Sequence, residues 1–174
     1  MTPAESQVPA GLVDLASARL GGVALLANDE FFAEKENLLK PGRGVFVADK
    51  YTDRGKWMDG WETRRRRTPG NDWCVVQLGL RGIIKQVDID TNHFLGNHPQ
   101  FASFDGVCLT NSCPKEPDKV EQLPWTQLLP QSSLQPGSQN PFAVPNEQTC
   151  THVRLNIFPD GGVSRMRLFG FIEK

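Results

Sequence analysis

The pattern that most restricts the fold lies close to the C-terminus. Residues 151–158 and 163–169 each alternate apolar with polar side chains, and the loop Pro-Asp-Gly-Gly at 159–162 separates them. Alternation with a period of two is typical of strands that bury one face. A short loop containing Asp and Gly is typical of a β-hairpin. We therefore predict a hairpin over residues 151–169.

The predicted register of this hairpin has an electrostatic consequence. If Phe158 pairs with Val163, the apolar side chains share one face, and Arg154 lies directly opposite Arg167 on the other. Like charges across a strand pair are destabilising unless an anion lies between them. We expect either an internal aspartate or a bound carboxylate to balance the two arginines, unless a different register separates them.

Residues 83–90 form a second strand with unusual side chains. Val87 and Ile89 are predicted to point to one face, whereas Asp88 and Asp90 point to the other. Two carboxylates two residues apart in a strand need cations or water nearby. These aspartates are therefore the candidate internal partners, and we favour such a partner over a ligand for at least one of the two arginines.

The rest of the chain consists of short apolar runs between Gly- and Pro-rich turns. We predict strands at 23–27, 45–47, 73–78 and 101–110, a turn between Gly79 and Gly82, and helical turns at 30–34 and 125–129. Residues 113–148, which are rich in proline, are predicted to form a long surface excursion. The expected fold class is an all-β sandwich or jelly roll with short helical turns.

The length and charge of the chain argue against several classes of protein. A chain of 174 residues suits one domain, which we place at residues 11–174 after a flexible N-terminus at residues 1–10. The net charge of −1 argues against a nucleic-acid partner. Neither a transmembrane run nor a secretory signal is recognised, so we expect a cytoplasmic protein without a membrane partner. The four cysteines lack zinc-finger spacing and are interpreted as reduced thiols.

Residues 57–67 read Trp-Met-Asp-Gly-Trp-Glu-Thr-Arg-Arg-Arg-Arg. Four consecutive arginines require solvent, acids or an anionic ligand, whereas the two tryptophans favour burial. The stretch is therefore either the edge of a site or a strand with one basic face. In an extended segment Glu62, Arg64 and Arg66 share one face, and Arg65 and Arg67 share the other.

This stretch resembles the allantoicase family. The matching segments are residues 29–33, 36–39, 55–66, 71–73, 87–91, 94, 96–97 and 151–167. The resemblance runs from about residue 15 to the C-terminus and rests mainly on the tryptophan-glutamate-arginine motif. It implies a jelly roll of the galactose-binding-like type and a cytosolic enzyme that hydrolyses allantoate to ureidoglycolate and urea.

One departure from the family concerns the number of modules. The family's enzymes carry two copies of this module in tandem, whereas this chain contains one. We expect a homo-oligomer, in which a partner chain replaces the second copy. The alternatives are an incomplete single repeat and a non-catalytic, galactose-binding-like module that binds a small ligand.

Allantoate bears one carboxylate and two ureido groups, so its recognition needs cations and polar acceptors. Cleavage needs an acid for the leaving nitrogen and a base for water. We assign Glu62 as the acid/base, with Asp59 and Asp90 as alternative or orienting carboxylates; the competing interpretation is that Glu62 only pairs with an arginine. The expected substrate-binding residues are Trp61, Arg64, Arg66, Asn97, His152, Arg154 and Arg167.

No cofactor is expected, although a divalent metal is not excluded by the sequence. Asp90, His93 and His98 are the only grouping that suggests a metal site. Their spacing matches no standard motif, so we assign no metal ligand.

Overall fold

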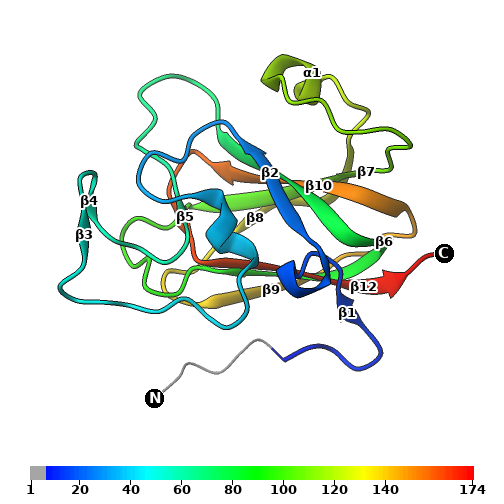
Figure 1. The fold of residues 1–174 in the computed structure, drawn as a ribbon, viewed down its shortest axis with the longest axis horizontal. Helices are drawn as coiled ribbons and strands as arrows, with labels where there is room; N and C mark the ends of the chain where they lie inside the picture. The colour runs from blue at the N-terminus through cyan, green and yellow to red at the C-terminus, as the bar shows by residue number, and fades with distance from the viewer. Residues whose placement is uncertain (1–6) are drawn as a thin grey trace.

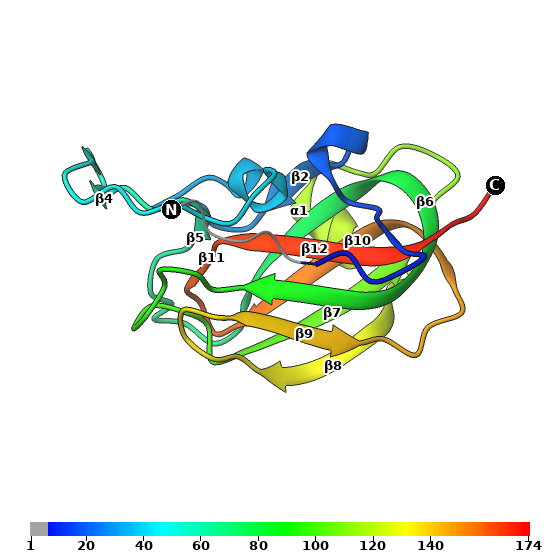
Figure 2. The same ribbon diagram turned by 90° about the horizontal axis from the view of Figure 1, so that it is seen from below.

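The computed structural model, which describes residues 7–174, shows an antiparallel β-sandwich built around one long strand, β6 (Asp72–Asp90). The first half of β6 pairs with β2 (Val23–Ala27) and β10 (Thr149–Phe158). Its second half pairs with β9 (Gln139–Ala143) and β12 (Arg165–Ile172). The strand curves from one layer into the other, as the edge-on view shows (Figure 2).

Three further strands complete the two layers (Figure 1). β7 (Phe101–Val107) pairs with β10, and β8 (Thr126–Ser133) pairs with β7. β1 (Val13–Asp14) pairs with β12 in the other layer. The layers are therefore β2–β6–β10–β7–β8 and β9–β6–β12–β1, which confirms the predicted all-β sandwich.

Short elements connect and cover these layers. The helices are the 3-10 turns η1 (Ala18–Leu20) and η2 (Lys35–Leu39) and the α-helix α1 (Pro117–Glu121). The short strands are β3 (Tyr51–Thr52), β4 (Gly55–Lys56), β5 (Trp61–Glu62) and β11 (Gly162–Val163). β3 pairs with β4 on an arm that projects from the sandwich, and β5 pairs with β11 at its end (Figures 1 and 2). None of the described helices is long and apolar enough to span a bilayer.

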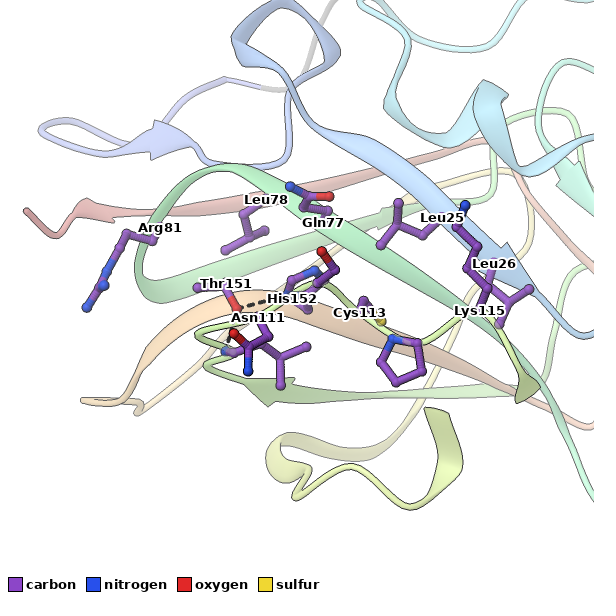
Figure 3. A pocket seen from close by; sticks show the side chains of 13 residues that line it. Leu25, Leu26, Gln77, Leu78, Arg81, Asn111, Cys113, Lys115, Thr151 and His152 are labelled. Atoms are coloured by element: carbon purple, nitrogen blue, oxygen red, sulfur yellow. Dashed lines mark hydrogen bonds between the residues drawn. The ribbon is translucent and has the colours of Figure 1, made fainter. Parts of the chain in front are cut away.

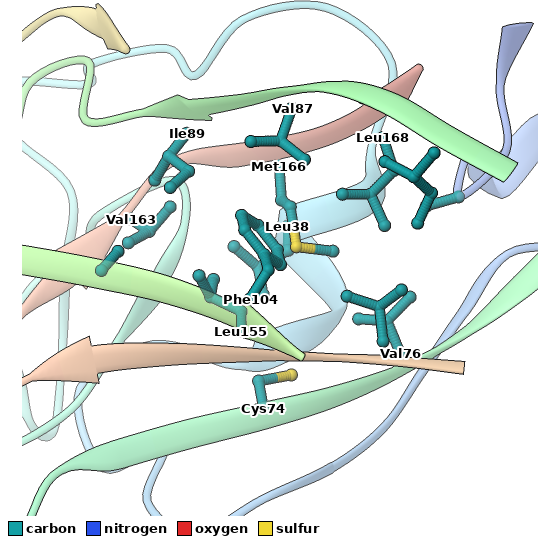
Figure 4. Packing of buried hydrophobic residues seen from close by; sticks show 14 of the residues in the cluster. Leu38, Cys74, Val76, Val87, Ile89, Phe104, Leu155, Val163, Met166 and Leu168 are labelled. Carbon is teal, nitrogen blue, oxygen red and sulfur yellow. The ribbon is translucent and has the colours of Figure 1, made fainter. Parts of the chain in front are cut away.

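The core lies between the two layers and follows the alternation along β6. Val76 in the first half of β6 and Val87 and Ile89 in the second half are completely buried. Leu155 of β10 and Met166 of β12 meet them from the two layers (Figure 4). The prediction that Val87 and Ile89 share one face is confirmed.

The predicted hairpin over 151–169 is wrong, because β6 lies between its two arms. The loop 159–162 instead carries the chain from one layer to the other, and β11 pairs with β5 on the way. Arg167 therefore lies opposite Asp88 of β6, and not opposite Arg154. Arg154 pairs with Asp105 of β7 at 2.9 Å, so the expected clash of like charges does not arise.

The predicted turn between Gly79 and Gly82 is also wrong, because both glycines lie inside β6. A Cβ at Gly79 would come within 2.3 Å of the Leu20 carbonyl oxygen, and a Cβ at Gly82 within 2.1 Å of the Phe171 carbonyl oxygen. These glycines lack a side chain and therefore permit close approach of neighbouring backbones, which is a common role of glycine within strands.

Other boundaries also need correction. The expected surface excursion at 113–148 contains α1 and the sheet strands β8 and β9, and its helix lies before the predicted 125–129. Residues 45–47 form no strand, and the helical turn expected at 30–34 occurs at η2. Of the predicted flexible N-terminus, residues 1–6 lie outside the described residues.

Candidate active site

A cavity of about 560 Å³ lies at the end of the sandwich where β5 meets β11. Glu62 of β5 and Arg65 are the lining residues with an acidic and a basic side chain on the strand side of the cavity. The remaining lining residues are Phe32, Thr63, Gly96, Asn97, His98, Gln100, Pro159, Asp160 and Gly161. This volume is in the range that accommodates a small polar metabolite.

Backbone hydrogen bonds on both sides hold Glu62 in place. Its N–H donates to the Ala33 carbonyl at 3.1 Å, and its own carbonyl accepts the N–H groups of Phe32 and Ala33. On the other edge Glu62 pairs with Gly162 of β11. Because β5 is only two residues long, this double pairing fixes the direction of the Glu62 side chain.

Glu62 is a buried carboxylate that forms no ion pair with any described residue. Asn97 Nδ2 donates a hydrogen bond of 2.6 Å to Glu62 Oε2. Burial raises the pKa of Glu62, and the Asn97 hydrogen bond opposes this only in part, so the net shift is upward. The alternative that Glu62 pairs with an arginine is not observed among the described residues.

The loop after β10 closes the cavity against β5. Gly161 N–H donates to Thr63 Oγ1 at 3.0 Å, and Thr63 N–H donates to the Gly161 carbonyl at 3.0 Å. Asp160 Oδ2 accepts a hydrogen bond of 2.8 Å from the backbone N–H of Arg66. Gly162 N–H donates to the Asn97 carbonyl at 2.8 Å, which links this loop to the Glu62 hydrogen bond.

Gly161→Ala is expected to destabilise the protein by about 1–3 kcal/mol and to weaken the Glu62–Asn97 contact. The φ angle of Gly161 is +132°, and an added Cβ would lie 2.6 Å from the Asn97 carbonyl oxygen. Gly96→Ala is the matched control, because no atom lies within 4 Å of a Cβ at that position in the same cavity. Chemical denaturation of both variants tests the prediction, and equal stabilities would contradict it.

Arg65 and His98 line the cavity, although the sequence did not single them out for substrate binding. Arg65 is exposed and has no ion-pair partner within residues 7–174. His98 Nδ1 is buried without a hydrogen-bond partner among these residues. The alternation of an extended segment predicted that the side chains of Arg65 and Glu62 point to opposite faces. β5 ends at Glu62, so this alternation does not extend to the arginines.

Arg64 and Arg66 each form an ion pair with an aspartate. Arg64 Nε lies 2.7 Å from Asp29 Oδ2 and remains largely exposed. Arg66 Nη1 lies 2.8 Å from Asp72 Oδ1, and Nη2 donates to the Pro69 carbonyl. Neither side chain lines the cavity that contains Glu62.

Asp59 and Asp90 are each neutralised by an arginine. Arg165 Nη2 lies 2.8 Å from Asp59 Oδ2. Burial raises the pKa of Asp59, but hydrogen bonds from Arg165 and the Val45 N–H outweigh it, so the net pKa is lowered. Arg43 binds both oxygens of Asp90 at 2.8 and 3.0 Å. These carboxylates have the environment of structural ion pairs and do not line the cavity.

The remaining predicted substrate-binding residues also lie outside the cavity. Trp61 is completely buried and donates Nε1–H to the Asp29 carbonyl at 2.8 Å. Arg154 and His152 belong to β10, and Arg154 stacks on Trp125. Arg167 Nη2 donates to the carbonyls of residues 40 and 42. Of the substrate-binding residues expected from the sequence, Asn97 is the one that shares the cavity with Glu62.

A metal centre is not assembled by the described residues. Residues 7–174 contain no group of three or more His, Cys, Asp or Glu side chains arranged to hold a metal ion. Asp90 binds Arg43, whereas the His93 ring lies 5.5 Å from the Phe46 ring and His98 lines the Glu62 cavity. The weak Asp90–His93–His98 grouping is therefore not brought together.

Comparison with solved structures defines the fold type. The chain superimposes on 94% of its length with allantoicase from Saccharomyces cerevisiae, with a TM-score of 0.75 and 37% identity, covering 45% of that chain. It also matches a module designated CBM32-3, from a family 31 glycoside hydrolase of Clostridium perfringens, over 92% of this chain and 95% of the module. That match has a TM-score of 0.59 at 12% identity, so it concerns the fold alone. The sandwich is thus a galactose-binding-like jelly roll.

Sequence comparison defines the family. A protein named "Probable allantoicase 1" from Burkholderia mallei is 48% identical over 158 residues, which cover 91% of this chain and 45% of the relative. The chain thus spans about half the length of the relatives it matches. The sequence model of the allantoicase repeat matches residues 13–173. With nearly its whole length matched, the chain belongs to the allantoicase family, as a single allantoicase repeat.

Proposed function

We propose that residues 11–174 act as one allantoicase-like domain that hydrolyses allantoate to ureidoglycolate and urea at the Glu62 cavity. The observation that carries the proposal is the environment of Glu62, a buried carboxylate with a raised pKa and no ion pair among the described residues. Such a group is suited to donate a proton at a pH where ordinary glutamates are ionised. The names of its relatives supply the substrate.

The proposed reaction replaces one ureido group on the central carbon of allantoate with a hydroxyl group. The bond from this carbon to nitrogen breaks, the leaving nitrogen takes the proton of Glu62, and urea departs. Oxygen from water bonds to the carbon, and a base accepts the proton that water loses. The imidazole of His98 is the candidate base in the same cavity, and proton return to Glu62 completes the cycle.

Substrate recognition is assigned to the groups that remain available in the cavity. The free guanidinium of Arg65 suits the allantoate carboxylate, because arginine presents two parallel N–H donors. The Asn97 amide and the Thr63 hydroxyl offer polar partners to ureido groups. Glu62 and Asn97, which were assigned from the sequence, therefore keep their roles, and Arg65 takes the position that was expected for Arg64 and Arg66.

We also infer that a second copy of the module accompanies this one in the working enzyme. The chain covers 45% of the Burkholderia mallei relative, so the relatives have room for a second unit of similar size. A partner chain in a homo-oligomer would supply it. Size-exclusion chromatography with light scattering tests this inference, and a strict monomer with full activity would contradict it.

The competing function is a non-catalytic module that binds a small polar ligand, which the CBM32-3 likeness in fold brings into consideration. Urea release from allantoate by the purified protein separates the two functions. Urea and ureidoglycolate formed in equal amounts would support the hydrolase. Binding of allantoate without any urea release would support the module.

Asn97→Ala is expected to move the alkaline limb of the pH profile of kcat/KM to higher pH. The Asn97 hydrogen bond favours the ionised form of Glu62 and lowers its pKa, so its removal raises that pKa further. A general acid is active below its pKa, and activity falls as pH rises through it. Urea release across a range of pH measures the shift, and Asn71→Ala, outside the cavity, is the control. A limb that moved to lower pH would contradict the assignment.

A further inference from the structure

A second cavity, of about 670 Å³, lies beside β2, β6 and β10 and shares no lining residue with the Glu62 cavity. β2 and β6 form one wall, β10 forms the floor, and residues 109–115 form the opposite wall (Figure 3). The hydrolase proposed above does not use this cavity. Its size is within the range of cavities that bind small organic molecules.

The floor of this cavity carries a buried histidine with one ring nitrogen fixed. His152 is 6% exposed, and its Nδ1 lies 2.8 Å from Thr151 Oγ1. The same hydroxyl accepts the Leu109 N–H at 2.8 Å, so Thr151 ties the wall loop to the floor. Burial lowers the pKa of His152, so the imidazole is neutral.

The second ring nitrogen of His152 remains available. Thr151 Oγ1 lies 2.8 Å from His152 Nδ1, and its hydroxyl donates to the Val107 carbonyl oxygen at 3.3 Å. Nε2 has no hydrogen-bond partner among residues 7–174, so this nitrogen is available to a ligand.

The walls combine apolar surface with unpaired positive charge. Leu26 and Leu78 line the cavity with the half-buried Leu109. Arg81 and Lys115 are exposed, and neither forms an ion pair with a carboxylate of the described chain. They lie at opposite ends of the row of lining side chains (Figure 3). None of the described residues that line the cavity is Asp or Glu, so the charged side chains of this lining are all positive.

We propose that this cavity binds a small organic acid with an apolar body. The apolar body packs on Leu26, Leu78 and Leu109, and the His152 ring forms the floor beneath it. Lys115 or Arg81 supplies the positive charge that compensates the carboxylate. A neutral ligand of the same shape lacks this last contribution and is the natural comparison.

Isothermal titration with 4-phenylbutanoate and its neutral amide, 4-phenylbutanamide, tests the proposal. We expect one molecule of the acid to bind per chain, at least about tenfold more tightly than the amide, because a hydrogen bond to a charged group contributes at least that factor. The double variant Arg81→Met/Lys115→Met is expected to lose this preference for the acid. Both side chains are exposed, so these substitutions leave the core intact.

Lys119→Met is the matched control, because Lys119 is an exposed lysine of α1 that lies outside the cavity. Circular dichroism confirms folding of each variant. Absence of acid binding to the unmodified protein, equal affinity for acid and amide, or an equal loss in Lys119→Met and the double variant would overturn the proposal.

Discussion

Glu62→Gln is expected to reduce urea release from allantoate by about 10²- to 10⁴-fold, because it removes the proposed general acid. Glutamine has nearly the same shape, and its amide oxygen can still accept the 2.6 Å hydrogen bond from Asn97. It cannot deliver a proton to the leaving nitrogen. Steady-state measurement of urea formation, with kcat and KM separated, is the direct test.

The stability of Glu62→Gln distinguishes lost chemistry from lost structure. The folded-state pKa of Glu62 is raised, so ionised Glu62 opposes folding at pH values above that pKa. Neutral glutamine removes this penalty, and the variant is expected to be at least as stable as the parent at neutral pH. Glu116→Gln, at an exposed glutamate, is the control and retains full activity. Unchanged turnover in a folded Glu62→Gln protein would eliminate the acid assignment.

Arg165→Met is expected to lower the free energy of unfolding by about 3–5 kcal/mol, the largest stability effect that we foresee. Arg165 is 3% exposed and lies 2.8 Å from the buried Asp59 carboxylate. It also donates to the carbonyls of Gly42 and Ser164, at 3.0 and 2.8 Å. Methionine fills similar space but leaves a buried charge without its partner. Guanidinium chloride denaturation at neutral pH measures the loss.

Two variants sharpen this test. Arg64→Met breaks an exposed ion pair and should change the free energy of unfolding by less than about 1 kcal/mol. Adding Asp59→Asn to Arg165→Met removes the orphaned charge and should recover part of the loss. If Arg165→Met lowered the free energy of unfolding no more than Arg64→Met, the buried Arg165–Asp59 pair would not be a major source of stability.

The pH dependence of the Arg165→Met effect has a definite sign. The pKa of Asp59 is lowered in the folded parent, so the ionised carboxylate stabilises the fold at pH values above its pKa in the unfolded chain. This stabilisation is lost as pH falls through the pKa of Asp59 in the folded protein. In the variant, burial without Arg165 favours protonation of Asp59. The stability difference between parent and variant is therefore largest near neutral pH and narrows under acidic conditions.

Local patterns along single strands were predictable from the sequence. The alternation of Val87 and Ile89 with Asp88 and Asp90 places the apolar pair in the core. Glu62 directly follows the fully buried Trp61, and burial at this place in the chain raises the pKa of its carboxyl group. These features depend on neighbours within a few residues, which is the range over which a sequence pattern constrains structure.

Pairing between distant segments was not predictable in the same way. The arms of the expected hairpin matched each other in apolar pattern, yet both pair with β6, whose two halves carry the same kind of pattern. Which arginine meets which acid follows from that pairing: Arg165 binds Asp59, and Arg43 binds Asp90. The sequence contains the charges, but the fold decides which arginine, here Arg65, remains free in the cavity.

The sharing of β6 between both layers has a consequence for how the molecule comes apart. Its 19 residues hydrogen-bond to β2 and β10 at one end and to β9 and β12 at the other. Detaching either layer therefore exposes backbone groups of the strand that anchors the other layer. We therefore expect the two layers to unfold as one cooperative unit, with the arm and the loops opening at a lower free energy than the strand ladder.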